Sequence, residues 1–125
     1  MTTEGALFEL PARYRQLQDE ARALALSCAD IAARAAEADR IDPEMRPRLA
    51  ASGLAEGTGA AASGGRFEAV DSLAVTVVRE VLAGVSAHLD SLFAMQGIGS
   101  FPVSTAAAEP LRQEWLPRVA RLEAI

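Results

Sequence analysis

Few side chains in this sequence could do covalent or acid–base chemistry. His88 is the only histidine, Cys28 is the only cysteine, and lysine is absent. A single histidine near a predicted helix start, with no second histidine or cysteine to share a metal, is typical of a surface or locally satisfied residue. Cys28 lies in an apolar stripe and is predicted to be a packed thiol. The sequence therefore predicts no catalytic residue and no metal site, and Schiff-base chemistry is excluded.

A glycine-rich segment, residues 53–65, contains the other candidate motif. Gly57, Gly59 and Ala62 fit the G-x-G-x-x-G/A pattern of dinucleotide-binding loops. That pattern holds a pyrophosphate only where a strand leads into it and a helix N-terminus follows it. Because the residues before it predict a helix that ends at Gly53, we predict a surface loop without a cofactor site.

Charge and composition exclude several classes of partner. Twelve arginines are interleaved with seventeen acidic residues, and the resulting net charge of −5 argues against a nucleic-acid partner. No apolar run approaches the ~18 residues of a membrane span, and the first five residues lack the basic and apolar regions of a signal peptide, so no membrane partner is expected. A single cysteine favours the reducing cytoplasm.

The composition predicts an all-α domain. Half of the residues are apolar, mainly Ala and Leu with few aromatics, which favours helices over strands. An amphipathic helix is expected from Pro11, and it can run unbroken to about Asp39. A dimeric coiled coil is an alternative, but an alanine-rich seam more often packs inside a bundle. The stripe comprises Leu10, Tyr14, Leu17, Ala21, Leu24, Cys28, Ile31 and Ala35.

The longest mainly apolar stretch, residues 73–102, is expected to organise the fold. Its helical stripe is formed by Leu73, Val77, Val81 and Val85, and beyond a break at Gly84 by Leu89, Leu92, Phe93 and Gln96. The branched residues 75–78 suit a strand, but the length of the pattern and the adjacent polar Arg79 and Glu80 favour two helices. Asp71 or Ser72 and Ser86 are the expected caps. A short apolar turn is predicted at residues 97–102.

Two further helices are predicted around prolines. One begins with Pro43 at its first position, where proline is favoured, and Pro47 is expected to distort it. The other opens at Pro110, and Pro117 is expected to loosen or end it. Trp115 on this last helix is predicted to anchor the core.

The order of the segments carries more information than any single motif. From Phe8, the chain reads FELPARYRQLQDEARALA, AARAAEADR, PEMRPRLAASGL, a Gly-Gly loop, the apolar helix pair, GIGSFPV and EPLRQEWLPRVARLEAI. The most specific pieces are Gly99-x-x-Pro102 and Trp115-Leu-Pro-Arg118 followed by Glu123-Ala-Ile125. In this order the segments resemble the N-terminal α-helical domain of acyl-CoA dehydrogenases over nearly the whole chain. The resemblance implies that domain's fold, an orthogonal or up-down bundle of about five to six helices.

Three places depart from that family's usual pattern. A Pro-Glu-x-Tyr-Gly-Gly type sequence is usual where this chain has residues 59–65, which keep only the glycines. Ala107 and Ala108 replace a usual Gly-Thr or Gly-Ser, so the last helix loses its cap. Leu122 stands where a glycine is usual.

The resemblance implies the oxidation of an acyl thioester, on CoA or an acyl-carrier protein, to its α,β-enoyl form. In the family a glutamate takes the α-proton, the β-hydride goes to FAD, and an electron-transfer flavoprotein accepts the electrons, as in fatty acid metabolism. The glutamate and most FAD contacts belong to a middle β domain and a C-terminal helical domain. We therefore expect residues 1–125 to be one helical domain that binds no FAD and is inactive alone.

The resemblance also implies a substrate-binding surface. By position, Ser91, Ala94, Met95 and Ile98 would form one wall of the acyl pocket, with residues 73–85 as scaffold. The alternative is that these four residues are ordinary core, because apolar positions at helical spacing are core by default.

Two interpretations of the whole chain remain open. In the first it is part of an acyl-CoA dehydrogenase, either a truncated piece or one half of a split enzyme that a companion chain completes. In the second it is a stand-alone, non-catalytic binding or assembly module derived from that family. The altered loop at 59–65 favours the second, whereas the ending at Glu123-Ala-Ile125 favours the first.

Overall fold

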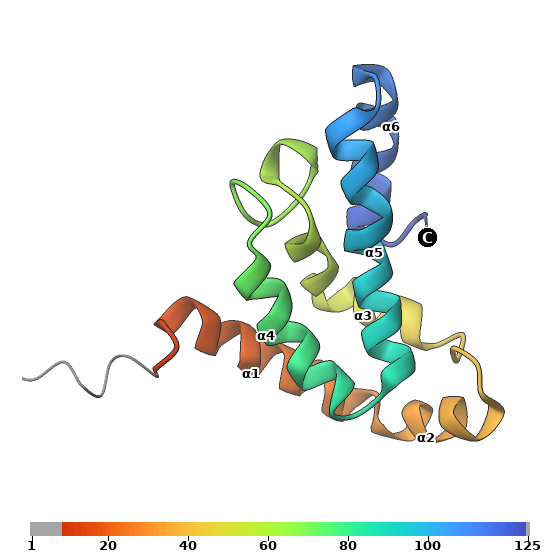
Figure 1. The fold of residues 1–125 in the computed structure, drawn as a ribbon. Coiled ribbons are helices and arrows are strands. Elements are labelled where there is room, and N and C mark those ends of the chain that lie inside the picture. The colour runs from red at the N-terminus through yellow and green to blue at the C-terminus, as the bar shows by residue number, and fades with distance from the viewer. Residues whose placement is uncertain (1–8, 125) are drawn as a thin grey trace, which may run out of the picture.

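The computed structural model describes residues 9–124, and this part of the chain folds into helices without a strand (Figure 1). This confirms the all-α prediction. The α-helices are α1 (Ala12–Ser27), α2 (Ala29–Ala38), α3 (Met45–Ser52), α4 (Ser72–Ala83), α5 (Ala87–Ala106) and α6 (Glu109–Ala120). Two 3₁₀ helices, η2 (Leu54–Thr58) and η3 (Ala61–Ser63), lie between α3 and α4.

The centre of the fold is the antiparallel pair α4 and α5 (Figure 1). Residues 84–86 join the two helices in a short turn, as the break at Gly84 predicted. Helix α1 packs against α4, and α2 packs against α5. Both lie across the end of the pair at which α4 and α5 are joined. Helix α6 folds back beside the far half of α5.

One apolar core joins these helices. The stripe predicted for the first helix faces this core, and Cys28 is fully buried, which confirms the packed thiol. Each fully buried Leu, Ile or Phe side chain contributes about 1.5–3 kcal/mol to stability. The largest fully buried side chains are Phe93, Ile31, Met45, Leu49, Leu54, Leu82, Leu89 and Leu122.

The helix predicted to run unbroken from Pro11 to Asp39 is in fact two helices that meet at Cys28. Cys28 has φ −101° and ψ 1°, and its N–H is shared between the carbonyl oxygens of Leu24 and Ala25. The Ser27 hydroxyl also donates to Leu24 O at 2.7 Å. Hydroxyls that bond back to the preceding turn compete with regular helix hydrogen bonds. The break therefore falls at Ser27 and Cys28, two residue types with weak helix propensity.

Helix α3 begins at Met45, two residues later than predicted. Pro43 lies in a preceding turn, in which the Glu44 N–H donates to Asp42 Oδ1 at 2.9 Å. Pro47 is consequently the third residue of α3 and lies in the first turn, where an N–H has no partner within the helix. The expected distortion at Pro47 is wrong for this reason, and α3 continues to Ser52.

The buried face of α4 is rotated from the predicted stripe. Leu73 and Val85 are 45 % and 43 % exposed, whereas the buried side chains are Ala74, Val77, Val78 and Leu82. Ala74 is small, so its burial brings α4 close to α1. A stripe that is assigned from large apolar residues does not include an alanine, so the burial of Ala74 was not predicted.

Residues 97–102 continue α5 and do not form the predicted turn. Pro102 removes one backbone donor, yet the helix runs on to Ala106, and the Ser104 and Thr105 hydroxyls donate to Phe101 O at 2.7 and 2.9 Å. Gly97 serves packing instead of a turn. A Cβ there would lie 3.4 Å from the Thr58 Cβ, so glycine lets η2 approach α5 closely.

Helix α6 likewise continues through Pro117 to Ala120. The prediction that Trp115 anchors the core is wrong, because Trp115 is 39 % exposed. Its ring lies 4.8 Å from the Arg118 guanidinium carbon, a cation–π distance. Leu116 and Ala120, four residues apart, are the buried residues of this helix.

Candidate functional site

A groove between α4 and α5 is the best candidate for a binding site. It has a volume of about 560 Å³, a size typical of small-molecule pockets. Its walls are mainly apolar and come from both helices, from η2 and from the loop before α4. The lining residues are Thr58, Val70, Ser72, Val75, Thr76, Arg79, Ala94, Gly97, Ile98, Phe101 and Pro102.

Side-chain caps fix the two helices that form this groove. The Asp71 carboxylate accepts hydrogen bonds from the N–H groups of Leu73 and Ala74, both at 3.1 Å. The Ser86 hydroxyl accepts from the Leu89 N–H at 3.2 Å. Such caps satisfy N–H groups that have no partner inside the helix, so they define where each helix starts. Both predicted caps are therefore confirmed.

A second helix is tied to this frame through Asp71. The Tyr14 hydroxyl on α1 donates to Asp71 Oδ2 at 2.9 Å. Hydrogen bonds to the carboxylate lower the pKa of Asp71, and the largest contribution comes from the Ala74 N–H. The start of α4 is consequently held by both its own backbone and α1.

The four residues predicted to contact substrate all lie on the side of α5 that faces away from the core. Met95 and Ile98 are 53 % and 62 % exposed, Ser91 is exposed, and Ala94 is half-buried. The alternative that they are ordinary core is wrong for the described domain. Ala94 and Ile98 line the groove, whereas Ser91 and Met95 lie on the same helix outside its lining.

The sequence reasoning missed the α4 side of the groove. Val75, Thr76 and Arg79 line it, so residues 73–85 are more than scaffold. The polar Thr76 and Arg79 interrupt the apolar pattern three residues apart, and this signal could have indicated a second, outward face of α4. Val70 and Thr58 had no signal, because only the tertiary fold brings them beside α5.

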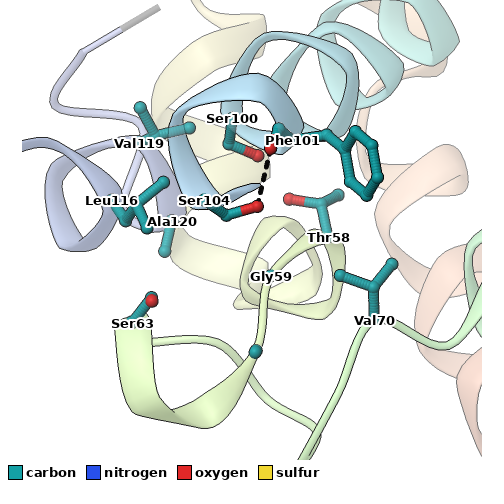
Figure 2. Close-up of a pocket in the computed structure, with 11 residues that line it drawn as sticks. Thr58, Gly59, Ser63, Val70, Ser100, Phe101, Ser104, Leu116, Val119 and Ala120 are labelled. Carbon is teal, nitrogen blue, oxygen red and sulfur yellow. Dashed lines mark hydrogen bonds between the residues drawn. The ribbon is translucent and has the colours of Figure 1, made fainter. Parts of the chain in front are cut away.

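A smaller cavity of about 50 Å³ lies beside the groove and is shown in Figure 2. It is enclosed by η2, η3, α5 and α6, with Leu116, Val119 and Ala120 on one side. Thr58, Val70 and Phe101 line both the cavity and the groove, so they form the partition between them.

Three of the four hydroxyl groups that line this cavity donate hydrogen bonds to backbone carbonyl oxygens. Thr58 donates to Ala55 O at 2.8 Å, Ser100 donates to Gly97 O at 3.3 Å, and Ser104 donates to Phe101 O. Among the residues that line the cavity there is no base to activate these three hydroxyls. They act as packing residues and not as nucleophiles.

The glycine-rich segment is compact rather than a simple loop. The Ala61 N–H donates to Phe67 O at 2.6 Å, and the Gly65 N–H donates to Ala60 O at 2.9 Å. A Cβ on Gly65 would lie 2.0 Å from Gly59 O, so only glycine fits this close approach. Helix α3, not a strand, precedes the segment, which supports the exclusion of a dinucleotide site.

The charges around the groove do not fit FAD. Among the lining residues Arg79 is the only cation, and both oxygens of Asp90 accept hydrogen bonds from it. The N-terminus of α4, beside the groove, already carries the carboxylate of Asp71. A pyrophosphate is stabilised by a net positive charge, but Asp90 neutralises the charge of Arg79, and the adjacent Asp71 carboxylate would repel it. The groove can hold an apolar chain, but it offers no cradle for this cofactor.

Residues with acid–base potential lie away from the groove. Cys28 is buried in the core, and the His88 Nε2 lies 3.7 Å from Asp39 Oδ1 on the α2 side of the molecule. Neither residue lines the groove. The residues that line the groove therefore include no histidine, cysteine or carboxylate that could act as a nucleophile, an acid or a base.

Comparison with known proteins identifies a family to which this chain is similar. Residues 11–123 match the family model described as "Acyl-CoA dehydrogenase, N-terminal domain". No match to a curated protein was found. Within the described part of the chain, none of the helices combines the length and the apolar character that crossing a bilayer requires.

Proposed function

Because the chain belongs to the acyl-CoA dehydrogenase family and corresponds to its N-terminal domain, we propose that it forms one wall of an acyl-thioester pocket. The observation that carries this proposal is the groove between α4 and α5, which is largely apolar and contains two of the four expected substrate residues, Ala94 and Ile98. Apolar walls suit an acyl chain, because burial of its methylene groups is favourable by about 0.8 kcal/mol each.

The proposed reaction is that of the family, the oxidation of an acyl thioester to its enoyl form. The catalytic base and the FAD site belong to a middle β domain and a C-terminal helical domain outside residues 1–125. These domains are supplied either by the same polypeptide or by a companion chain. The substrate is carried by CoA or an acyl-carrier protein, an electron-transfer flavoprotein takes the electrons, and the location is the cytoplasm.

The role assigned to this domain is positional. Ile98 and Phe101, 62 % and 59 % exposed, are available to contact an acyl chain, and the capped α4 and α5 hold this surface rigid. A rigid wall lowers the entropy lost when a ligand is placed. Ser91 and Met95 extend the same surface beyond the groove and are proposed to contact substrate once the other domains are present.

A second candidate function has one observation in its favour. The segment 59–65 keeps only the glycines of the family's usual sequence, and Ala62 and Ser63 present small side chains there. A stand-alone binding or assembly module would have no need for substrate or cofactor contacts in this segment. We retain this module as the alternative to the dehydrogenase domain.

The test of the groove is an NMR titration of the ¹⁵N-labelled 125-residue chain. Octanoyl-CoA is expected to shift the amide signals of Ala94 and Ile98, whereas free CoA is not. Ile98→Asp should abolish these shifts, and Leu26→Asp is the matched control, since Leu26 is 77 % exposed on α1. Equal shifts with CoA and octanoyl-CoA would contradict an acyl site in this groove.

A flavin measurement tests the proposal that FAD is bound by the other domains and not by residues 1–125. The purified chain is expected to carry no FAD and to oxidise no acyl-CoA. Flavin absorbance that survives gel filtration at near-equal stoichiometry would show that this domain alone holds the cofactor, contrary to the proposal.

A further inference from the structure

A bidentate ion pair connects α4 and α5 close to the turn that joins them. Arg79 Nε donates to Asp90 Oδ1 at 2.9 Å, and Arg79 Nη2 donates to Asp90 Oδ2 at 2.8 Å. The Asp90 side chain is only 12 % exposed, whereas that of Arg79 is 47 % exposed. The aspartate is thus anchored inside the fold, and the guanidinium reaches outward from it.

This pair lies at one end of the groove. Arg79 and Ala94 are the lining residues nearest to the turn at residues 84–86, and the opposite end is formed by Ser72 and Phe101. Eight residues separate Ala94 from Pro102, which corresponds to a length of ~12 Å along α5. An acyl chain that extends along the groove from Phe101 toward the turn would therefore end beside this ion pair.

Beyond Arg79 the apolar lining gives way to charge. A second hollow of about 330 Å³ shares Val75, Thr76 and Arg79 with the groove, and its remaining lining residues are Glu80, Ala83 and Asp90. One guanidinium and two carboxylates therefore surround the place where the groove ends. Their formal charges sum to −1, so this end is polar but does not attract an anion.

The guanidinium retains donors that Asp90 does not use. Two of its five N–H groups bind the aspartate, and the described residues offer no acceptor to the other three. Its hydrogen bond to Asp90 also raises the pKa of Arg79, so the side chain stays charged. An alkyl chain end placed here would displace the water that is hydrogen-bonded to these N–H groups and offer no acceptor in its place, which is unfavourable. A neutral oxygen at the chain end would accept hydrogen bonds from them instead.

We propose that Arg79, oriented by Asp90, recognises an uncharged hydrogen-bond acceptor at the far end of the acyl group. This inference rests on the proposed function, because it takes the groove to be the acyl site. It narrows the substrate class to acyl thioesters whose chain ends in a hydroxyl or carbonyl group. Terminal carboxylates are disfavoured, since Asp90 and Glu80 repel them.

The experiment compares three ligands on the 125-residue chain: octanoyl-CoA, its 8-hydroxy derivative and its 8-carboxyl counterpart, octanedioyl-CoA. The hydroxy ligand is expected to bind about tenfold more tightly than octanoyl-CoA, as one hydrogen bond to a charged donor provides. It should also shift the Arg79 Nε–H signal, which octanoyl-CoA should leave in place. Octanedioyl-CoA is expected to bind no more tightly than octanoyl-CoA.

Two variants separate recognition from a purely structural ion pair. Arg79→Met keeps most of the side-chain volume and should remove the tenfold preference while octanoyl-CoA still binds. Arg22→Met is the matched control, because Arg22 also pairs with an aspartate, Asp19, but lies on α1. It should leave the preference unchanged. Circular dichroism checks that each variant keeps its helices.

The outcomes distinguish this inference from the proposed function. Shifts at Ala94 and Ile98 with equal affinity for the plain and hydroxy ligands overturn the recognition by Arg79 and leave the acyl groove intact. Tighter binding of the plain ligand overturns it as well. If no acyl ligand shifts the signals of Ala94 and Ile98, the proposed function is overturned. The recognition by Arg79, which rests on it, is then overturned as well. The wild-type comparison alone decides, even if Arg79→Met fails to fold.

Discussion

The two faces of α5 are both apolar, yet one is buried in the core and the other is exposed. Leu89, Leu92 and Phe93 are at most 2 % exposed, whereas Met95, Ile98 and Phe101 are 53–62 % exposed on the same helix. The first set packs against other helices of the domain, and nothing in the described part of the chain covers the second. A helix that is apolar on all sides needs partners on all sides. This domain provides them for one face only.

The difference separates, along a single helix, the residues that stabilise the fold from those that are exposed and available for contact with another molecule. The inner face contributes to the core that keeps the domain folded, and the outer face borders the groove with α4. An exposed apolar patch beside a groove marks a site where another molecule or domain binds. Substitutions should therefore affect stability on one face and ligand contact on the other.

The largest expected effect comes from exchanging one phenylalanine on each face for alanine. Phe93→Ala should lower the free energy of unfolding by about 3–5 kcal/mol, because it leaves a cavity in the core. Phe101→Ala should lower it by less than about 1 kcal/mol, since this ring is 59 % exposed. Urea denaturation measures both values, and equal losses would refute the division between the two faces.

A pair of glycines on α5 tests the same division at closer range. Gly97→Leu should destabilise the domain by about 1–3 kcal/mol, because its side chain must displace Thr58 of η2. Gly99→Leu should stabilise it by about 0.5–1 kcal/mol, since no atom lies within 4 Å of its Cβ and leucine favours helix. Thermal unfolding of the two variants is the measurement. A gain in both would mean that η2 does not pack tightly on α5.

Acidification should weaken the frame around the groove. The Arg66 side chain hydrogen-bonds to Glu20 and lowers its pKa, and the Ala74 N–H does the same for Asp71. A carboxyl whose folded pKa is depressed contributes stability above its unfolded pKa, about 4, and loses it as the pH falls through the folded value. Urea midpoints should therefore decrease below about pH 4.

A conservative variant serves as the control for this pH dependence. Asp71→Asn keeps a good capping residue but cannot titrate, so its midpoint should fall less than that of the wild type on acidification. An acid loss identical in both proteins would remove Asp71 from the explanation. The groove lining itself contains no carboxylate, so acid should affect the frame before the binding surface.

The smallest effect on stability is expected at Met95, the exposed residue beside the groove. Met95→Trp should change the free energy of unfolding by no more than about 0.5 kcal/mol. In an enzyme completed by the remaining domains, the larger ring should shift preference toward shorter acyl chains. An unchanged chain-length profile would remove Met95 from the substrate wall.

Much of the helical framework could be predicted, because its signals are local. The stripe of α1 and α2, the caps Asp71 and Ser86 and the break at Gly84 are all where their residue types place them. The errors occur where packing overrides a local signal. Gly97 and Pro102 suggest a turn, but contacts with η2 and α6 keep this segment helical. Trp115 suggests a core anchor, but Leu116 takes that place.

The candidate site was predictable on one side only. The family resemblance indicated Ala94 and Ile98 on α5, but substrate contact at these residues stays a prediction. Thr58 reaches the groove from η2 and Val70 from the loop before α4, and neither carries a pattern of its own. Pairwise spacing within a helix cannot reveal such neighbours, since they depend on how separate elements pack.

The sequence by itself determined the helical class, the family and the central apolar pair, because these depend on residue type, period and segment order. Only the tertiary structure decided which apolar face is core and which is surface. That choice depends on the partners available to each face, since burial requires another element to exclude water. The same packing places Arg79 and Asp90, eleven residues apart in sequence, together at the end of the groove.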